Sequence, residues 1–312
     1  MTATALRSRA TAVRAKRNPL SMVKSIFFPV APMYLLMVVP AIILFTFFIM
    51  YPAVQGAIWS FTNYVGYGSS KFIGFANYKA AFADPTIRDS YGFTLLFAVV
   101  ACIVTNIVAM GLALALNAKI RWRTGFRTVF FMPMVLSGLI VSYIFTFIIG
   151  TSVPIISGVI HFAPLESDIL ANQHLAWLGV VFVASWVAVP GAIIIYLAGL
   201  VSIPSEVYEA ASIDGATGWK KFQTMTFPLL FPFFIINTIL TFKGFLNVYD
   251  VVVGLTGGGP GTATTSVAQT IFNGFYSGDY AYQMANAVIF FIITLFFALF
   301  QLSVIRRRGG SL

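Results

Sequence analysis

Six long apolar segments dominate the sequence and constrain its fold more than any other feature. They lie at about residues 30–52, 92–117, 128–150, 175–200, 227–253 and 284–305. A helix needs about 20 apolar residues to cross the hydrocarbon core of a bilayer, and each segment is long enough. Only 9% of the residues are charged, whereas soluble domains carry about 25%. The sequence therefore predicts an all-α membrane protein with six transmembrane helices, spanning residues 30–305.

The first apolar segment has a basic leader and so resembles a secretory signal peptide. It is too long for the apolar region of such a peptide, and no convincing cleavage site of small residues follows it. We expect an uncleaved first span that follows a basic tail of residues 1–29. The basic residues before the first span are Arg7, Arg9, Arg14, Lys16, Arg17 and Lys24.

The links between the segments alternate in charge, which predicts their sides of the membrane. Short loops rich in Lys and Arg stay in the cytoplasm. The links after the second and fourth segments and the C-terminal tail at 306–312 are basic, as is the N-terminal tail. The links at 151–174 and 254–283 contain no Lys or Arg. Both termini are therefore expected in the cytoplasm, and residue 265 outside it.

Composition argues against several classes of function. The formal net charge of +10 comes from residues dispersed over the links, without the aromatic and basic surface of a nucleic-acid-binding module. The single cysteine, Cys102, excludes an intramolecular disulfide and a Cys-x-x-Cys metal site. The sequence has no Gly-x-x-x-x-Gly-Lys-Ser/Thr phosphate loop with which to hold ATP. We expect no catalytic residue, metal site or cofactor in this chain, and no nucleic-acid partner.

The link at 201–226 is predicted to form a short polar helix. Pro204 ends the preceding helix, Ser205 is a favourable N-cap for a helix over 206–214, and Gly215 suits a left-handed stop. So short a helix is marginal by itself, and packing against the membrane domain and a partner would have to hold it. Within it, Val207, Ala210 and Ala211 are expected to share a face, and a second short helix, at 219–226, should precede the fifth span.

This link carries a resemblance to a known family. Residues 209–232 read Glu-Ala-Ala-Ser-Ile-Asp-Gly-Ala-Thr-Gly-Trp-Lys-Lys-Phe-Gln-Thr-Met-Thr-Phe-Pro-Leu-Leu-Phe-Pro. The run resembles the signature of permease subunits of binding-protein-dependent ABC importers, and within them the sugar permeases related to the maltose importer. The sequences at 72–78, 127–133 and 255–260 support the resemblance. The chain lacks the additional N-terminal spans and large external insertion of some maltose-type subunits, so it is similar to the compact six-span, type I members.

The resemblance implies an assembly and a location. The partners would be a second homologous permease in a heterodimer, two cytoplasmic ABC ATPase subunits that use ATP and Mg, and an extracellular or periplasmic solute-binding protein. The location would be the cytoplasmic (inner) membrane of a bacterium or archaeon, among membrane lipids. The solute would be a sugar or oligosaccharide, although related importers carry glycerol phosphates. The helix at 206–214 would sit in a cleft of the ATPase, and its coupling residues would be Glu206, Glu209, Ala210, Ala211, Asp214 and Gly215.

Polar and aromatic side chains within the spans are candidates for the solute pathway, because ionisable groups inside a membrane usually face the protein interior. Thr241, Phe245 and Tyr249 are four residues apart and should share one helical face. Aromatic rings stack on the C–H surfaces of a sugar, while hydroxyl and carboxylate groups bind its hydroxyls. The alternative for Thr241 is helix packing. The candidate pathway residues are Trp186, Gly191, Thr241, Phe245, Asn247, Tyr249 and Asp250.

Two other interpretations remain open from the sequence. An ion-gradient-driven secondary transporter would use Lys243 and Asp250 as an ion relay, but the spans contain no pair of broken helices. The glycines at 257–259 would suit an ion filter of backbone carbonyls, or more simply an ordered turn that faces the binding protein. The aromatic stretch at 59–78 suits either an interfacial cap or a partner contact.

Overall fold

The computed structural model describes residues 32–118, 121–161 and 165–309. They divide into two compact units, one reaching Gly56 and one beginning at Ala57. The described part of the first unit is a long apolar helix, in which α2 (Pro32–Phe45) continues through the π-helical turn η1 (Thr46–Met50) into the first residues of α3 (Tyr51–Trp59). The tail at 1–29 and residues 310–312 lie outside the described residues.

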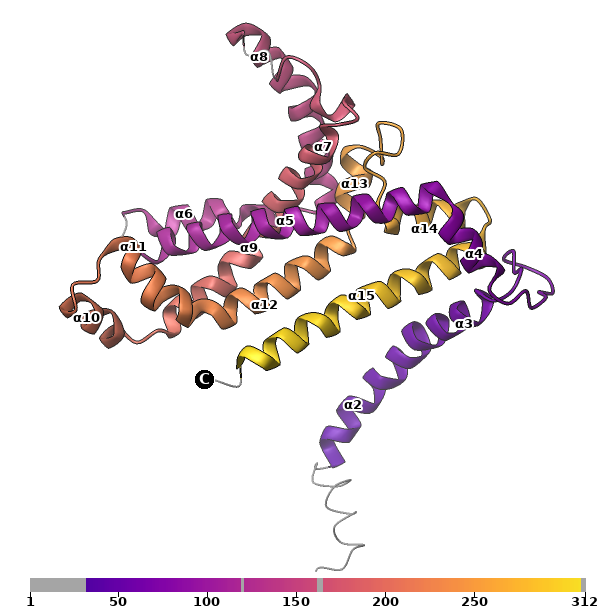
Figure 1. The fold of residues 1–312 in the computed structure, drawn as a ribbon, viewed down its shortest axis with the longest axis horizontal. Coiled ribbons are helices and arrows are strands. Elements are labelled where there is room, and N and C mark those ends of the chain that lie inside the picture. Colours follow the sequence, from indigo (N-terminus) through magenta and orange to yellow (C-terminus); the bar gives the residue numbers. More distant parts are fainter. Residues whose placement is uncertain (1–31, 119–120, 162–164, 310–312) are drawn as a thin grey trace, which may run out of the picture. The chain divides into compact units, whose positions relative to one another are not determined.

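The second unit is built around four long helices that run side by side (Figure 1). These are α5 (Pro85–Asn117), α9 (Ala176–Ser202), α12 (Phe227–Leu246) and α15 (Tyr280–Gly309). Within the described ranges, six helices are long and apolar enough to cross a membrane, which confirms the predicted six-span, helical fold. A helix satisfies its backbone hydrogen bonds internally, as a lipid environment requires, and the two longest helices, α5 and α15, carry no charged residue in their central turns.

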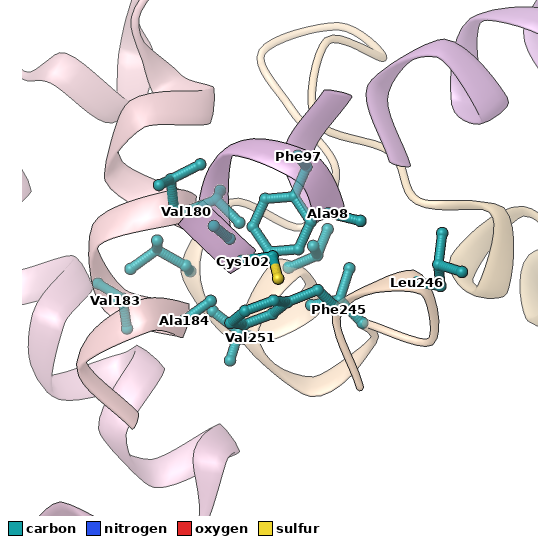
Figure 2. Packing of buried hydrophobic residues seen from close by; sticks show 14 of the residues in the cluster. Phe97, Ala98, Cys102, Val180, Val183, Ala184, Phe245, Leu246 and Val251 are labelled. Atoms are coloured by element: carbon teal, nitrogen blue, oxygen red, sulfur yellow. The ribbon is translucent and has the colours of Figure 1, made fainter. Parts of the chain in front are cut away.

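Small residues let these helices approach closely. Lipid is as apolar as the helix surfaces, so packing rather than the hydrophobic effect holds membrane helices together. One buried cluster lies where α5, α9 and α12 meet the short helix α13 (Asp250–Leu255), and Figure 2 shows Phe97 and Phe245 within it. A second cluster lies nearer the other end of α5 and α9. Alanines at the contacts are Ala98, Ala101, Ala109, Ala113, Ala184 and Ala192.

The third span lies later in the sequence than predicted. The helix α6 (Arg123–Phe131) is followed by a 3₁₀ turn, η2 (Met132–Val135), and an extended backbone at Leu136. Pro133 lies in this turn, and its missing N–H and fixed φ disfavour a continuous helix. The membrane-length helix is instead Gly138–Ile160, composed of α7 (Gly138–Phe147), η3 (Ile148–Ser152) and α8 (Val153–Ile160). The predicted boundaries of 128–150 are therefore wrong.

The fifth span also differs from the prediction at both ends. It begins at Gly218, because α11 (Gly218–Lys221) and η6 (Phe222–Thr226) run directly into α12. The second short helix expected at 219–226 is thus the first part of the span itself. At the other end α12 stops at Leu246, where Asn247 has φ −95° and ψ 22°, and α13 starts afresh. The predicted span of 227–253 is wrong because its last residues belong to a separate helix.

The ends of the bundle carry different segments (Figure 1). The helix α10 (Ser205–Ile213) and the start of α6 lie at the same end as the last turns of α15. The helices α4 (Ala76–Ala83) and α14 (Val267–Tyr276) lie at the opposite end. The basic start of α6 and the lysines of α11 thus lie at one end, whereas the segment of α14, which contains no Lys or Arg, lies at the other.

A compact cap closes the α4 end. The Ser60 and Tyr78 hydroxyl oxygens lie 2.6 Å apart, and the Asn77 amide donates to the backbone carbonyls of Ser60 and Thr62 at 2.8 Å each. The N–H of Ala281 donates to the carbonyl of Tyr64, which joins the cap to the first turn of α15. The aromatic stretch at 59–78 is therefore an ordered part of the second unit.

Candidate functional site

The polar link folds as the short helix α10, with its start one residue earlier than expected. Pro204 occupies the N-cap position with φ −60° and ψ 143°, and Ser205 is the first helical residue. The prediction that Ser205 caps the helix is wrong, since no side-chain cap bond forms there. The extended backbone that an N-cap requires is compatible with the fixed φ of proline. Glu206 in the first turn favours the helix through its macrodipole.

The end of α10 is a Schellman motif. Gly215 has φ +71°, and its N–H donates to the carbonyl of Ser212 at 3.2 Å. The N–H of Ala216 donates to the carbonyl of Ala211 at 2.9 Å. These two bonds satisfy carbonyls that the helix end would otherwise leave free, and they bring the buried side chains of Ala211 and Ala216 together. The predicted left-handed stop at Gly215 is confirmed.

The two faces of α10 differ. Ala211 is 1% exposed, and Val207 and Tyr208 are half-buried on the same side. Ala210 is on the same helical turn as Val207 and Ala211 but is exposed, so it borders the outer surface. The outer surface carries three acidic side chains together with Ala210: Glu206, Glu209 and Asp214 are all exposed.

Two large apolar side chains extend this outer surface. Ile213 is 87% exposed at the last turn of α10, and Trp219 is 68% exposed on α11. Apolar patches rimmed by polar residues mark sites of protein or membrane contact. Neither residue was among the predicted coupling residues, although an isoleucine between Ser212 and Asp214 in a polar helix was a signal for such a contact.

The candidate pathway residues separate into two groups, and Thr241 belongs to a buried polar network. Its hydroxyl donates to the carbonyl of Asn237 at 2.7 Å and accepts the amide of Asn106 at 3.2 Å. The Tyr196 hydroxyl donates to the Asn106 carboxamide oxygen at 2.6 Å. Thr241 thus joins α5, α9 and α12 at their packed centre. Asn106 was missed, and its signal was a carboxamide in the middle of an apolar segment.

Two more of the candidate pathway residues pack against other aromatic rings. Phe245 is 6% exposed, and its ring meets that of Phe97 edge-on at 5.7 Å (Figure 2). The half-buried Trp186 packs against Phe145 at 5.2 Å between ring centroids. Gly191 is also half-buried, and a Cβ there would meet no heavy atom within 4 Å. Of these three positions, Gly191 is the one with free space beside it.

The remaining candidates lie at the break between α12 and α13. Asn247 and Asp250 are exposed, and the Tyr249 ring lies 4.7 Å from that of Phe272 on α14. Because α12 ends at Leu246, the expectation that Tyr249 continues a helical face from Thr241 and Phe245 is wrong. The break instead presents an amide, a phenol and a carboxylate close together in sequence at the end of the fifth span, next to the exposed Lys243.

The glycine run after α13 forms an ordered turn. Gly257 and Gly258 have φ +61° and +93°. The Gln269 amide donates to the carbonyl of Gly257 at 2.8 Å, and the Thr265 hydroxyl donates to that of Gly258 at 3.1 Å. The Thr264 hydroxyl donates to the carbonyl of Gly259 at 2.7 Å. Side chains of the following loop and of α14 thus donate hydrogen bonds to these carbonyls, which favours the structured turn over an ion filter.

Comparisons with known proteins agree with this arrangement. The family model for the binding-protein-dependent transport system inner membrane component matches residues 107–309. The chain is 37% identical to the multiple sugar-binding transport system permease protein MsmF of Streptococcus mutans, over 87% of this chain and 94% of that protein. It is 31% identical to the sn-glycerol-3-phosphate transport system permease protein UgpA of Agrobacterium fabrum, over 91% and 98%.

A solved structure shows the same fold. A bacterial ABC transporter involved in the import of the acidic polysaccharide alginate contains a chain that matches with a TM-score of 0.76 and 21% identity, over 88% of this chain and 95% of that one. The family match covers α10, the break after α12 and the glycine turn. The chain therefore belongs to the family of binding-protein-dependent transport system inner membrane components, and it is a permease subunit of an ABC importer, a transport subunit rather than an enzyme.

Proposed function

We propose that this permease forms, with a second homologous permease, the membrane pathway for a sugar or oligosaccharide that an external solute-binding protein delivers. Two cytoplasmic ABC ATPase subunits supply the energy from ATP and Mg. The observation that carries the proposal is the placement of α10, whose outer surface of acidic and apolar side chains lies at one end of the bundle, opposite α4 and α14 (Figure 1). Partner binding at one end and solute delivery at the other match this polarity.

The coupling surface comprises the outer face of α10 and its continuation on α11. Glu206, Glu209 and Asp214 offer carboxylates to the ATPase, and Ile213 and Trp219 offer apolar contacts that would be desolvated on docking. Ala210 allows a close backbone approach. Closure of the ATPase dimer on ATP would move α10 and shift the spans from an inward-open to an outward-open arrangement.

The solute pathway is assigned to the break after α12. Asn247, Tyr249 and Asp250 offer an amide, an aromatic ring and a carboxylate, which are the groups that bind the hydroxyls and C–H faces of a sugar. Gly191 leaves space on the neighbouring span. The half-buried Thr241 and Trp186, and the buried Phe245, are proposed to support this region by packing.

The orientation follows from the side on which α10 meets the ATPase. The end of the bundle with α10, the start of α6 and the last turns of α15 would face the cytoplasm, together with both termini. A reporter enzyme that functions only in the cytoplasm, fused at residue 265, should be inactive. Cytoplasmic activity at residue 265 would contradict this orientation.

The test is uptake by the reconstituted importer. The permease pair, the ATPase and the binding protein are assembled in vesicles, and uptake of labelled maltotriose, raffinose and sn-glycerol 3-phosphate is measured with and without ATP. We expect ATP-dependent uptake of an oligosaccharide that stops when the ATPase alone is inactivated. Uptake that persists on an ion gradient would support a secondary transporter, and uptake of sn-glycerol 3-phosphate alone would contradict the assignment to a sugar.

Two variants separate the pathway from packing. Asp250→Asn and Tyr249→Phe each remove one polar function from the break and keep the side-chain shape. They should lower oligosaccharide uptake while ATP hydrolysis by the assembled complex continues. Thr241→Val provides the comparison, because its hydroxyl is held within the buried network. If Thr241→Val lowered uptake at unchanged complex stability and the other two did not, the pathway would lie at the network instead.

A further inference from the structure

The covalent connection between α10 and the fifth span is poorly suited to transmit movement. It consists of residues 214–217, followed by the first residue of α11. Gly215 and Gly218 both have positive φ, of +71° and +48°, and a Cβ built at either would meet no heavy atom within 4 Å. Only Ala216 in this connection is buried. A short link with a glycine at each end and little packing absorbs rotation, so a rigid connection needs a second contact.

Lys221 provides that contact. Its ammonium nitrogen donates to the hydroxyl oxygen of Ser212 at 2.9 Å and lies 5.3 Å from the centroid of the Tyr208 ring. The Ser212 hydroxyl donates to the backbone carbonyl of Tyr208 at 2.8 Å, which leaves its lone pairs free to accept from the lysine. One cation is therefore held between two side chains that are one turn apart on α10.

The position of Lys221 in the chain connects α10 to the fifth span. Lys221 is the last residue of α11, and the helix continues from it through η6 into α12. The residue that contacts α10 therefore lies in the first turn of the fifth span, which begins at Gly218. The π-helical turn η6 follows directly, and α10 packs against it.

We propose that Lys221 is a positioning residue that latches α10 to the fifth span, so that movement of α10 driven by the ATPase reaches the break at Asn247. The inference rests on the proposed function. With the latch, α10 and the start of the fifth span move together. Without it, the glycine link would let α10 move while the span stays in place.

The neighbouring lysine gives a matched control. Lys220 has the same charge and is exposed, and within the described part of the chain its side chain has no hydrogen bond or ion pair. Lys221→Met keeps the length of the side chain and removes the charge and the donor. Lys221→Arg keeps both, since a guanidinium donates hydrogen bonds and stacks on aromatic rings. Lys220→Met repeats the charge change without touching the latch.

The experiment reads movement at the far end of the span without requiring a known solute. A single reporter, Asn247→Cys, is labelled with fluorescein maleimide in the assembled complex in nanodiscs, with and without ATP and vanadate. The buried Cys102 is the only other cysteine of this chain, and the complex assembled without the reporter gives the background labelling. ATP hydrolysis and the copurification of the ATPase are measured on the same samples.

The latch predicts a defined pattern. Lys221→Met should reduce the ATP-dependent change in labelling rate by about fivefold or more, a factor typical of coupling between sites, while the ATPase copurifies and hydrolyses ATP. Lys221→Arg should restore the change, and Lys220→Met should leave it intact. A purely structural role would instead lower the thermal stability of the complex and affect all readouts together.

Other results would overturn the latch. It is refuted if Lys221→Met keeps the full ATP-dependent change, if Lys220→Met shows an equal loss, or if Lys221→Met loses the ATPase from the complex, which would make Lys221 a docking contact. The proposed function fails separately if the reporter with both lysines intact shows no response to ATP, and the latch then fails with it.

Discussion

Gly215 offers the sharpest perturbation of the coupling surface, because its backbone conformation and its surroundings have opposite implications for a substitution. Its φ of +71° strains any residue with a Cβ, yet no heavy atom lies within 4 Å of where that Cβ would be. A loss on substitution would therefore arise from the backbone rather than from a steric clash. The series Gly215→Asn, Gly215→Ala and Gly215→Val raises the strain in steps, since Asn tolerates the left-handed region and a β-branched residue is least suited to it.

The magnitude follows from the conformational penalty. A left-handed residue with a Cβ costs about 1–2 kcal/mol, which corresponds to a factor of roughly 5–30 in an equilibrium. The short helix α10 has little stability to spare, so the penalty should shift it away from the conformation with the Schellman bonds. We expect uptake to fall in the order Asn, Ala, Val, with a nearly complete loss for Val.

The assay separates coupling from folding. Uptake is measured with the reconstituted importer, membrane insertion is quantified by immunoblot, and copurification of the ATPase reports docking. Gly111→Ala is the matched control, because Gly111 is an exposed residue inside α5 with equally free space and no positive φ. It should leave uptake unchanged. Full uptake by Gly215→Val, or an equal loss in Gly111→Ala, would refute the argument.

Three further predictions concern the stability of the second unit. Tyr196→Phe leaves the buried Asn106 carboxamide oxygen without its donor and should cost about 1 kcal/mol, seen as a lower unfolding midpoint of the purified complex; an unchanged midpoint would contradict the network. Burial raises the pKa of Asp84, but hydrogen bonds from Tyr282 and from the backbone outweigh that effect and hold the pKa below its usual value. This carboxylate therefore stabilises the fold at neutral pH and loses that effect as the pH falls below about 4. The difference in melting temperature between the wild type and Tyr282→Phe should therefore shrink in acid, and a constant difference would contradict the linkage. Gly254→Val should destabilise the complex by about 1–3 kcal/mol, measured by thermal unfolding, because a Cβ at Gly254 would lie 2.7 Å from a side-chain carbon of α7; wild-type stability would show that the two helices separate freely.

The sequence predicts those parts of the fold that depend on local chemistry. The six spans follow from the length of apolar runs, which needs no knowledge of contacts. The left-handed stop at Gly215 follows from the low cost of positive φ for glycine. The shift of the third span to Gly138–Ile160 was also signalled locally, by Pro133, but the apolar residues on both sides of that proline concealed the break.

Features that depend on contacts between distant segments could not be predicted. The apolar run after Asp250 fits a continuous helix as well as it fits α13, and the break is associated with packing of Tyr249 on Phe272 from another helix. Similarly, the hydrogen bonds that join Thr241 to Asn106 and Asn106 to Tyr196 connect three different spans. Three sequence positions with no shared periodicity meet only in the folded bundle.

The central claim is that the outer face of α10 meets an ATP-hydrolysing subunit, and a crosslink from that face tests it most directly. A cysteine-reactive photocrosslinker is attached at Ala210→Cys, and Ala211→Cys serves as its adjacent control because Ala211 is buried. In a complex that transports solute, we predict a crosslink from position 210 to the ATPase subunit and none from position 211. If position 210 never reaches an ATP-hydrolysing subunit in such a complex, α10 is not the coupling element.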